Sequence, residues 1–347
     1  MVVVRPVQME DLSQLVDLTY RETFGLTSLP RDAGLLKKRI RESIHSFSKE
    51  VEQPGGELYV FVMEDLETSR VIGTSCIVAK VGGFQPFYMY RVETCIHESV
   101  RLGIHKEVPI LHLVKEHSGP SEIGGLLLDP EHRRHGNGRL LSLFRFLFMS
   151  EYRERFEPTV IAEMRGVLDA NGNSPFWEAL GRYFFDMDYP SADLLSALDK
   201  RFIADLMPTC PIYIPLLPKS AQEVIGQVHE QTKPALKLLQ DEGFRYINMV
   251  DIFEAGPVVS CTLENIRIVR ESRTAAISEI VPEEAGPSQH LVTSSTDQFR
   301  ACKGTVEMQS DGSARISEEV ARTLRLSPGD RIRFAPLRPS AKDKEQT

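Results

Sequence analysis

The chain has 347 residues, which at about 150 residues per domain corresponds to two or three domains. Its 41% hydrophobic and 26% charged residues are typical of an ordinary globular protein and exclude wholesale disorder or a collagen-like repeat. The formal net charge of −8 gives the chain no overall attraction for nucleic acid or for an anionic membrane. No apolar run reaches the roughly 18 residues that a membrane helix needs. We therefore expect neither nucleic-acid nor membrane partners.

The cysteine and histidine content argues against a metal or disulfide framework. The five cysteines are an odd number, are widely spaced and form no CxxC pair. The histidines also lack the spacing of metal ligands, so we expect no metal. The N-terminus has neither the basic flank nor the length of a signal peptide, which favours a cytoplasmic protein.

The first half of the chain alternates between strand patterns and helical patterns. Apolar residues at three- to four-residue spacing predict amphipathic helices, and β-branched or aromatic runs predict strands. The expected strands cover residues 2–4, 58–63, 71–78, 108–114, 122–128 and 158–167. The expected helices cover residues 9–18, 36–47, 139–149 and 174–180, of which 139–149 is apolar enough to be fully buried.

The middle of the chain gives weaker signals. Ser220 and Glu223 have the spacing of a capping box, which predicts a helix over residues 221–228. A second helix is expected from Thr232 to Gly243, followed by a strand over residues 244–253. A weak internal similarity links residues 176–181 to residues 238–244. In both segments an expected helix ends on a glycine next to aromatic residues, which fits a degenerate repeat.

The C-terminal part is predicted to be a separate small unit. Residues 272–298 are rich in Ser, Thr, Glu and Pro and are expected to be a linker. After it we expect a strand over residues 304–308, a helix over 317–326 and a strand over 331–335. The last residues, 339–347, are expected to fray.

The segment with the most chemical information joins the strand at 122–128 to the buried helix. It carries Arg133, Arg134, Gly136 and Gly138 directly before the helix. The first N–H groups of a helix are unpaired, the helix dipole attracts negative charge, and arginine adds charge-assisted bonds to phosphate oxygens. A dinucleotide fingerprint and a Walker loop are both excluded by the glycine spacing and by the missing GK[ST]. The segment therefore predicts a diphosphate site, with a polar turn that caps a buried helix as the alternative.

In this context the R-x-x-G-x-G pattern resembles the pyrophosphate loop of GNAT acyl-CoA N-acyltransferases. The resemblance implies an α+β fold with a mixed, mostly antiparallel sheet flanked by helices, which splays at its fourth strand to hold the thioester. A second α/β half, possibly a degenerate repeat, and a small C-terminal β-rich subdomain would follow. The implied units are a GNAT-like acyl-CoA-binding domain at residues 1–195, a second α/β portion at 196–270, a linker at 271–298, a C-terminal subdomain at 299–338 and a disordered tail at 339–347.

Segments along nearly the whole chain are similar to those of arginine N-succinyltransferases. They lie at residues 25–30, 127–130, 136–142, 145–148, 162–166, 174–177, 202–208, 224–229, 251–253, 255–257 and 328–334. The resemblance implies transfer of the succinyl group of succinyl-CoA to the α-amino group of L-arginine, giving N2-succinyl-L-arginine and CoA in arginine catabolism. Succinyl-CoA would be a co-substrate, with no permanently bound cofactor.

The resemblance also assigns roles to single residues. His229 matches the catalytic proton donor, and the expected helix over 221–228 would place it at a C-terminal end, where the dipole raises its pKa. A surface histidine that caps the helix is the alternative. Leu126 matches a position whose backbone contacts succinyl-CoA, although it also suits an ordinary core leucine. The expected pyrophosphate set is Arg133, Arg134, Gly136, Asn137 and Gly138.

The guanidinium of the acceptor is best bound by carboxylate side chains, and the succinyl carboxylate is best bound by arginine side chains. Glu163 and Arg165 lie two apart on an expected strand and so face the same side. Asp169, Arg91 and Asp251 are further candidates. For each of these residues a structural ion pair is the alternative.

Three other functions stay open from the residues alone. The enzyme could use ornithine or another amine, or acetyl-CoA as the donor. The chain could instead be a non-catalytic partner subunit of such an enzyme. It is expected to form either a homo-oligomer or a hetero-oligomer of paired subunits. The unit at 304–335 also faintly resembles DNA-binding transition regulators, but the net charge and the acidic pair Glu318 and Glu319 oppose contact with phosphate.

Overall fold

The protein is described by a computed structural model over residues 1–21, 30–83, 85–282, 289–295 and 298–339. The similar segment at residues 25–29 and nearly all of the expected tail lie outside this range. Within it, no helix is long and apolar enough to cross a membrane.

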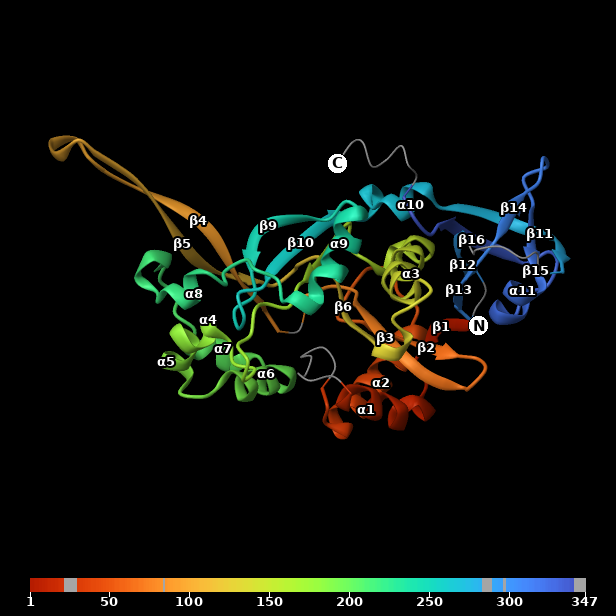
Figure 1. The fold of residues 1–347 in the computed structure, drawn as a ribbon, viewed down its shortest axis with the longest axis horizontal. Coiled ribbons are helices and arrows are strands. Elements are labelled where there is room, and N and C mark those ends of the chain that lie inside the picture. Colours follow the sequence, from red (N-terminus) through yellow and green to blue (C-terminus); the bar gives the residue numbers. More distant parts are fainter. Residues whose placement is uncertain (22–29, 84, 283–288, 296–297, 340–347) are drawn as a thin grey trace.

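The described strands form one continuous sheet, in the order β14-β15-β11-β16-β12-β13-β1-β2-β3-β6-β7-β10-β9-β4-β5-β8 (Figure 1). The first strands are β1 (Val2–Pro6), β2 (Leu58–Asp65), β3 (Arg70–Val78), β4 (Phe87–Ser99), β5 (Ile104–Glu116), β6 (Ser121–Leu128), β7 (Thr159–Glu163) and β8 (Ile212–Tyr213). The others are β9 (Arg245–Val250), β10 (Pro257–Thr262), β11 (Arg273–Val281), β12 (His290–Ser294), β13 (Ala301–Gly304), β14 (Val306–Met308), β15 (Ala314–Ser317) and β16 (Arg331–Pro336).

The helices lie on and around this sheet (Figure 1). They are α1 (Leu12–Tyr20), α2 (Ala33–Ser48), α3 (Asn137–Glu151), α4 (Pro175–Ala179), α5 (Gly181–Phe185), α6 (Tyr189–Leu198), α7 (Arg201–Leu206), α8 (Lys219–Gln222), α9 (Lys233–Asp241), α10 (Arg267–Glu271) and α11 (Glu318–Leu324). In the described residues, β6–β7 and β11–β15 pair in parallel and the other neighbours are antiparallel. The expected mixed, mostly antiparallel sheet is confirmed.

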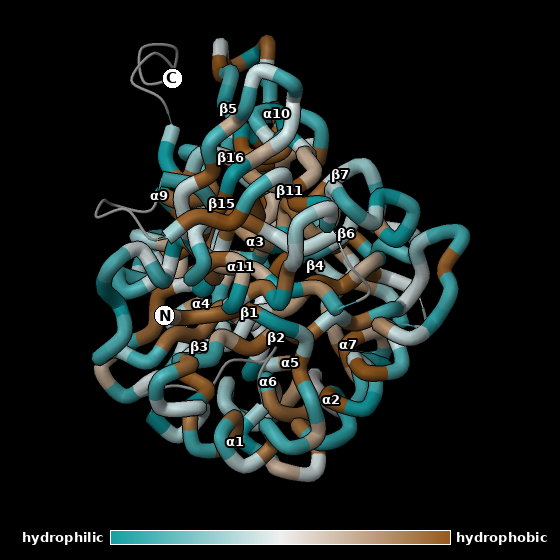
Figure 2. The backbone as a smooth tube through the Cα atoms, turned by 90° about the vertical axis from the view of Figure 1, so that its right-hand side faces the viewer, coloured by the Kyte–Doolittle hydropathy of each residue, from teal (hydrophilic) through white to brown (hydrophobic). Residues whose placement is uncertain are grey.

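The N-terminal part of the sheet is covered by helices on both faces. In β2, Tyr59 and Phe61 pack in the same core as α3, whereas the alternating Val60 and Val62 pack in the core of α1 and α2. This two-residue period follows from the strand pleat. Figure 2 shows hydrophobic segments in the middle of the molecule, near β1, β2 and α4. α3 is buried from Leu140 to Met149, as its composition predicted.

Every strand and helix expected in residues 1–180 has a counterpart, but β4 was not predicted. β4 and β5 pair along their whole lengths. Among the described residues, β4 pairs with β9 only at Tyr90 and Arg91, and β5 pairs with β8 only at Ile110 and Leu111. The ends of the two strands therefore form a two-stranded ribbon that projects from the body (Figure 1). Its exposed residues lack the hydrophobic pattern of a buried strand.

The expected linker at residues 271–298 is wrong, because this segment contains β11 and β12. β12 lies between β13 and β16, and its Leu291 and Val292 are fully buried. In β11, the buried Ala275 and Ile277 alternate with exposed residues, so that the composition alone looked polar. The strand–helix–strand unit of the C-terminal part is present as β14, α11 and β16, with β15 added.

The expected helix over residues 221–228 is also wrong. α8 ends at Gln222 and begins after Pro218, so Ser220 is not its cap. Gly226 then has a φ of +74°, a left-handed conformation that interrupts a helix. The expected helix before Gly243 and the strand after it are present as α9 and β9.

Candidate active site

The sheet splits between β6 and β7. These parallel strands pair only at Ser121 with Val160 and at Glu122 with Ile161. The rest of β6 continues beside β3, while β7 continues beside β10, so the two strands separate beyond Glu122. The splayed strand that the family resemblance implied is therefore present.

A β-bulge lies in β6 on the wall of this split. The register of β6 against β3 shifts between Thr74 and Cys76, where Gly125 and Leu126 together face one residue of β3. Gly125 has a φ of +57°, and a Cβ there would lie 3.0 Å from the Cys76 sulfur, so glycine is required. A bulge leaves backbone groups without a partner in the ladder. The bulge therefore interrupts the regular ladder at Gly125 and Leu126, on the wall of the split.

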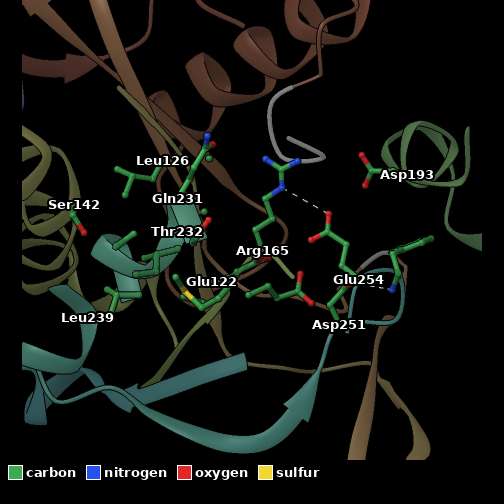
Figure 3. A pocket seen from close by; sticks show the side chains of 18 of the residues that line it. Glu122, Leu126, Ser142, Arg165, Asp193, Gln231, Thr232, Leu239, Asp251 and Glu254 are labelled. Carbon is green, nitrogen blue, oxygen red and sulfur yellow. Dashed lines mark hydrogen bonds and ion pairs between the residues drawn. The ribbon is translucent and has the colours of Figure 1, made fainter. Parts of the chain in front are cut away.

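The split holds a cavity of about 270 Å³. β6 supplies Leu126, β7 and the following residues supply Glu163 and Arg165, and α9 and the loop before it supply Thr232 and Leu239. Figure 3 shows Leu126, Ser142 and Leu239 at one end and Asp193, Asp251 and Glu254 at the other. A second cavity, of about 410 Å³, is lined by α2 and shares Glu122, Gly124 and Glu163 with the first. The split is therefore accessible from both faces of the sheet.

Five half-buried carboxylates line the first cavity, namely Glu122, Glu163, Asp193, Asp251 and Glu254. Burial raises the pKa of Glu163 well above its ordinary value, and the nearby Glu122 and Asp251 raise it further. Burial also raises the pKa values of Glu122 and Asp251. Mutual repulsion and desolvation both disfavour the ionised form of these carboxylates. A cation bound in the cavity would stabilise the ionised form.

Glu254 is held in place by hydrogen bonds from two sides. Its Oε2 accepts from the N–H of Gly166 at 2.7 Å, and its Oε1 accepts from the Tyr189 hydroxyl. The Nε of Arg165 lies 4.0 Å from Oε1, and Figure 3 shows this pair within the cavity. Burial and the neighbouring Asp251 raise the pKa of Glu254 to about 7.

Close backbone packing brings these groups together. A Cβ on Gly256 would lie 2.0 Å from the Met164 carbonyl oxygen, and one on Gly166 would lie 2.4 Å from the Glu254 carbonyl oxygen. Two glycines therefore let the segment after β7 cross the turn that carries Asp251 and Glu254. This crossing places Glu163 and Arg165 opposite the two acids.

His229 lies beside this cavity rather than among the residues that line it. Its N–H donates to the Arg165 carbonyl at 2.9 Å, and its Nδ1 accepts from the N–H of Gln231 at 3.2 Å. It precedes the 3-10 turn Glu230–Thr232 and α9, so it caps an N-terminus and not the expected C-terminus. Burial and the positive charge of Arg165 lower its pKa, so the expected upward shift of the pKa is wrong.

The basic loop occupies the N-terminus of α3, as expected. Gly136 is the N-cap with a φ of +78°, and Asn137 is the first residue of the helix. Lys303 of β13 donates to the His135 carbonyl and, at 2.9 Å, to the Asn137 side chain, which ties the C-terminal strands to the loop. Next to it lies a cavity of about 710 Å³, and its described lining contains no acidic residue. That lining comprises His135, Gly136, Arg139, Gln289, Lys303, Pro336, Leu337 and Arg338.

The structure thus separates the expected residues into three groups. Leu126, Glu163, Arg165 and Asp251 share the first cavity. The loop residues lie at the N-terminus of α3, and His229 lies at the edge. Two weaker candidates are elsewhere. Arg91 lies in β4 where this strand pairs with β9, and it forms an ion pair with Glu93. Asp169 accepts hydrogen bonds from N–H groups of its own loop.

Sequence reasoning missed Glu122 and Glu254, which belong to the acidic end of the cavity. Glu122 directly precedes the predicted split, but Glu254 is 91 positions from Glu163 in the chain and meets it only through the glycine crossing. Within the described residues, no group of three or more His, Cys, Asp or Glu side chains is arranged to hold a metal ion.

Comparison with known proteins gives matches along almost the entire chain. The family model described as Arginine N-succinyltransferase beta subunit matches residues 2–268, and the model of its C-terminal domain matches residues 272–336. Arginine N-succinyltransferase of Escherichia coli strain 55989 is 41% identical over 339 residues, which cover 97% of this chain and 98% of that protein. The Shigella flexneri protein of the same name is equally similar, with 41% identity over 339 residues. The structure of arginine/ornithine succinyltransferase subunit AI from Pseudomonas aeruginosa has 36% identity and a TM-score of 0.89, and the match covers 98% of this chain and 99% of that one.

Proposed function

Because the chain belongs to the arginine N-succinyltransferase family, we propose that it transfers the succinyl group of succinyl-CoA to the α-amino group of L-arginine. The products are N2-succinyl-L-arginine and CoA. The observation that carries this proposal is the cavity in the split, which joins the bulged backbone of β6 to five carboxylates. Such a site suits a thioester at one end and a cationic amine at the other.

The donor half of the proposal uses the loop before α3. The N–H groups of the first turn, together with Arg133, Arg134, Gly136, Asn137 and Gly138, would bind the diphosphate of CoA. The acyl chain would then run along β6, where the N–H of Leu126 would bind the thioester oxygen and stabilise the negative charge that develops on it. The lack of acidic residues in the described lining of the neighbouring cavity supports this use of the loop.

The acceptor half uses the acidic end of the cavity. Glu163, Glu122, Asp251 and Glu254 would bind the positive charges of arginine, and Arg165 would bind a substrate carboxylate. The α-amine attacks the thioester carbon in its neutral form, after its ammonium group has lost one proton to solvent. The C–N bond forms, the C–S bond breaks, and the proton lost from nitrogen ends on the sulfur of CoA.

His229 would assist the departure of the thiolate. Since Nδ1 accepts a hydrogen bond from Gln231, the proton of the neutral ring is on Nε2. A neutral imidazole can then stabilise the thiolate through an Nε2–H hydrogen bond. Proton donation in the full sense needs the imidazolium, which the lowered pKa makes a stronger acid.

Ornithine is a second candidate acceptor. The Pseudomonas aeruginosa relative is named arginine/ornithine succinyltransferase, and the same carboxylates would bind the ammonium group of ornithine. A panel of amines with succinyl-CoA separates the two, because the preferred acceptor has the higher kcat/KM.

We also propose that the chain works in an oligomer, either of identical or of paired subunits. The ribbon of β4 and β5 supports this, because its tip exposes Ile96, Val100, Leu102 and Ile104 to solvent. An isolated two-stranded ribbon is only marginally stable in water, so a partner surface would cover it.

The proposed reaction is tested by incubating the purified chain alone with succinyl-CoA and following the release of free thiol. Thiol release that requires arginine, with a matching mass for succinylarginine, is the expected result. Glu163→Gln should raise KM for arginine more than KM for succinyl-CoA. If arginine does not stimulate thiol release, the proposal is wrong or the chain needs a paired subunit, which adding a candidate partner would reveal.

A further inference from the structure

Arg145 is a buried cation in the wall of the cavity, next to the bulge of β6. It lies in α3, is 2% exposed and contributes to the cavity lining. Its Nε donates to the Ser142 carbonyl at 2.9 Å, and its two terminal nitrogens donate to the Gly124 carbonyl at 3.3 Å and to the Ser142 hydroxyl at 3.2 Å. All three acceptors are neutral. Among the described residues, no carboxylate forms an ion pair with this guanidinium.

A buried guanidinium of this kind is costly unless an anion neutralises it. Arg267 shows the usual arrangement, since it is 3% exposed and pairs with Glu242 at 2.6 Å and with Glu271 at 2.8 Å. Arg145 has five N–H groups, and its bonds to the described residues use three of them. Two N–H groups are therefore available for an anion that enters the cavity.

The position of Arg145 relative to the bulge determines which anion can reach it. Its guanidinium touches the carbonyl of Gly124, and the bulge at Gly125 and Leu126 follows directly. A succinyl group places its carboxylate only two methylene groups away from the thioester carbonyl. If the thioester oxygen binds at Leu126, the carboxylate must lie within that short distance. Figure 3 shows Ser142 and Leu126 well away from Asp193, Asp251 and Glu254, which would repel a carboxylate.

We propose that Arg145, oriented by Ser142, binds the distal carboxylate of the acyl group and so selects a dicarboxylic acyl donor over acetyl or butyryl donors. This inference rests on the proposed acyl transfer. Arg165 is the other arginine of the cavity, but it lies near Glu254 at the acidic end and is better placed for the carboxylate of the amino acid. The two arginines thus divide the two carboxylates of the substrates between them.

The test compares succinyl-CoA with butyryl-CoA, which has the same four carbons but no carboxylate, and uses arginine as the acceptor. Arg145→Met should reduce the ratio of kcat/KM for succinyl-CoA to that for butyryl-CoA by roughly 10²-fold or more, because a site built for a polar group rejects an analogue without it. Arg145→Lys keeps the charge and should retain part of the preference. Arg133→Ala is the matched control, which should weaken both donors equally.

The outcomes separate this inference from the proposed function. If the wild-type chain transfers no acyl group, the proposed function fails first. If it transfers succinyl but Arg145→Met and Arg145→Lys keep the wild-type preference, or if Arg165→Met abolishes it instead, the assignment of Arg145 is wrong. Should Arg145→Met not fold, a crystal structure of the wild-type chain with a non-reactive succinyl-CoA analogue decides. A carboxylate within hydrogen-bond distance of Arg145 supports the inference, and a carboxylate elsewhere overturns it.

Discussion

His229 sits where a small group of neighbours fixes its tautomer, so its substitution should be informative. His229→Ala should lower kcat by about 10²-fold, which is typical of a general acid–base group, while leaving the melting temperature nearly unchanged. His117→Ala, at an exposed histidine outside the site, is the control. Steady-state kinetics with succinyl-CoA and arginine provide the measurement. An unchanged kcat in the folded variant would remove His229 from the mechanism.

Glu254 should make the binding of arginine depend on pH. Its pKa is about 7 in the structure, so raising the pH from 6 to 8 ionises a carboxylate that is mostly protonated at the start. The ionised form binds a cation more strongly, and linkage then predicts a decrease in Kd for arginine of about tenfold over this range. Calorimetry without an acyl donor measures this directly. Glu254→Gln should bind more weakly and lose this dependence, and an equal pH dependence in both proteins would contradict the assignment.

At the scale of elements, α3 and the loop before it connect the C-terminal domain to the site. Lys303 of β13 bonds the loop at His135 and Asn137, so its loss should loosen the loop without touching the cavity in the split. Lys303→Met should therefore raise KM for succinyl-CoA by about three- to tenfold, the magnitude of one ordinary hydrogen bond, with little change in kcat. Lys106→Met, on the exposed ribbon, is the control. A KM equal to that of the wild type would show that the C-terminal domain does not support the loop.

The elements also show how far the sequence could be used. The buried α3 and the alternating β2 have strong periodicity, and the basic loop has a physical meaning of its own, so each could be predicted. β11 was missed because its few buried residues alternate with exposed polar ones. The helix expected over residues 221–228 is wrong because Gly226 adopts a left-handed conformation, which the capping pattern did not reveal. Leu126, Glu163 and Arg165 were found through local spacing and resemblance. The place of Glu254 in the cavity and the contact of Arg145 with Gly124 depend on packing between distant segments, which no local pattern encodes.

At the scale of the whole molecule, the ribbon of β4 and β5 should govern assembly. Val100 and Leu102 at its tip are 89% and 69% exposed, and replacing both with aspartate should weaken a subunit contact made by this tip. Analytical ultracentrifugation should then show a smaller species than the wild type. Arg101→Asp places the same acid at a neighbouring polar position and should have less effect. A double variant with the wild-type mass would show that the tip does not mediate assembly.

The proposed reaction requires one location for the donor, between β6 and β7 with its diphosphate at the start of α3. A crystal structure of the protein with CoA tests this most directly. We expect the diphosphate to contact the N–H groups and side chains of residues 133–138, and the thiol to point into the split near Leu126. CoA bound at another surface, with the loop and the split empty, would contradict the account.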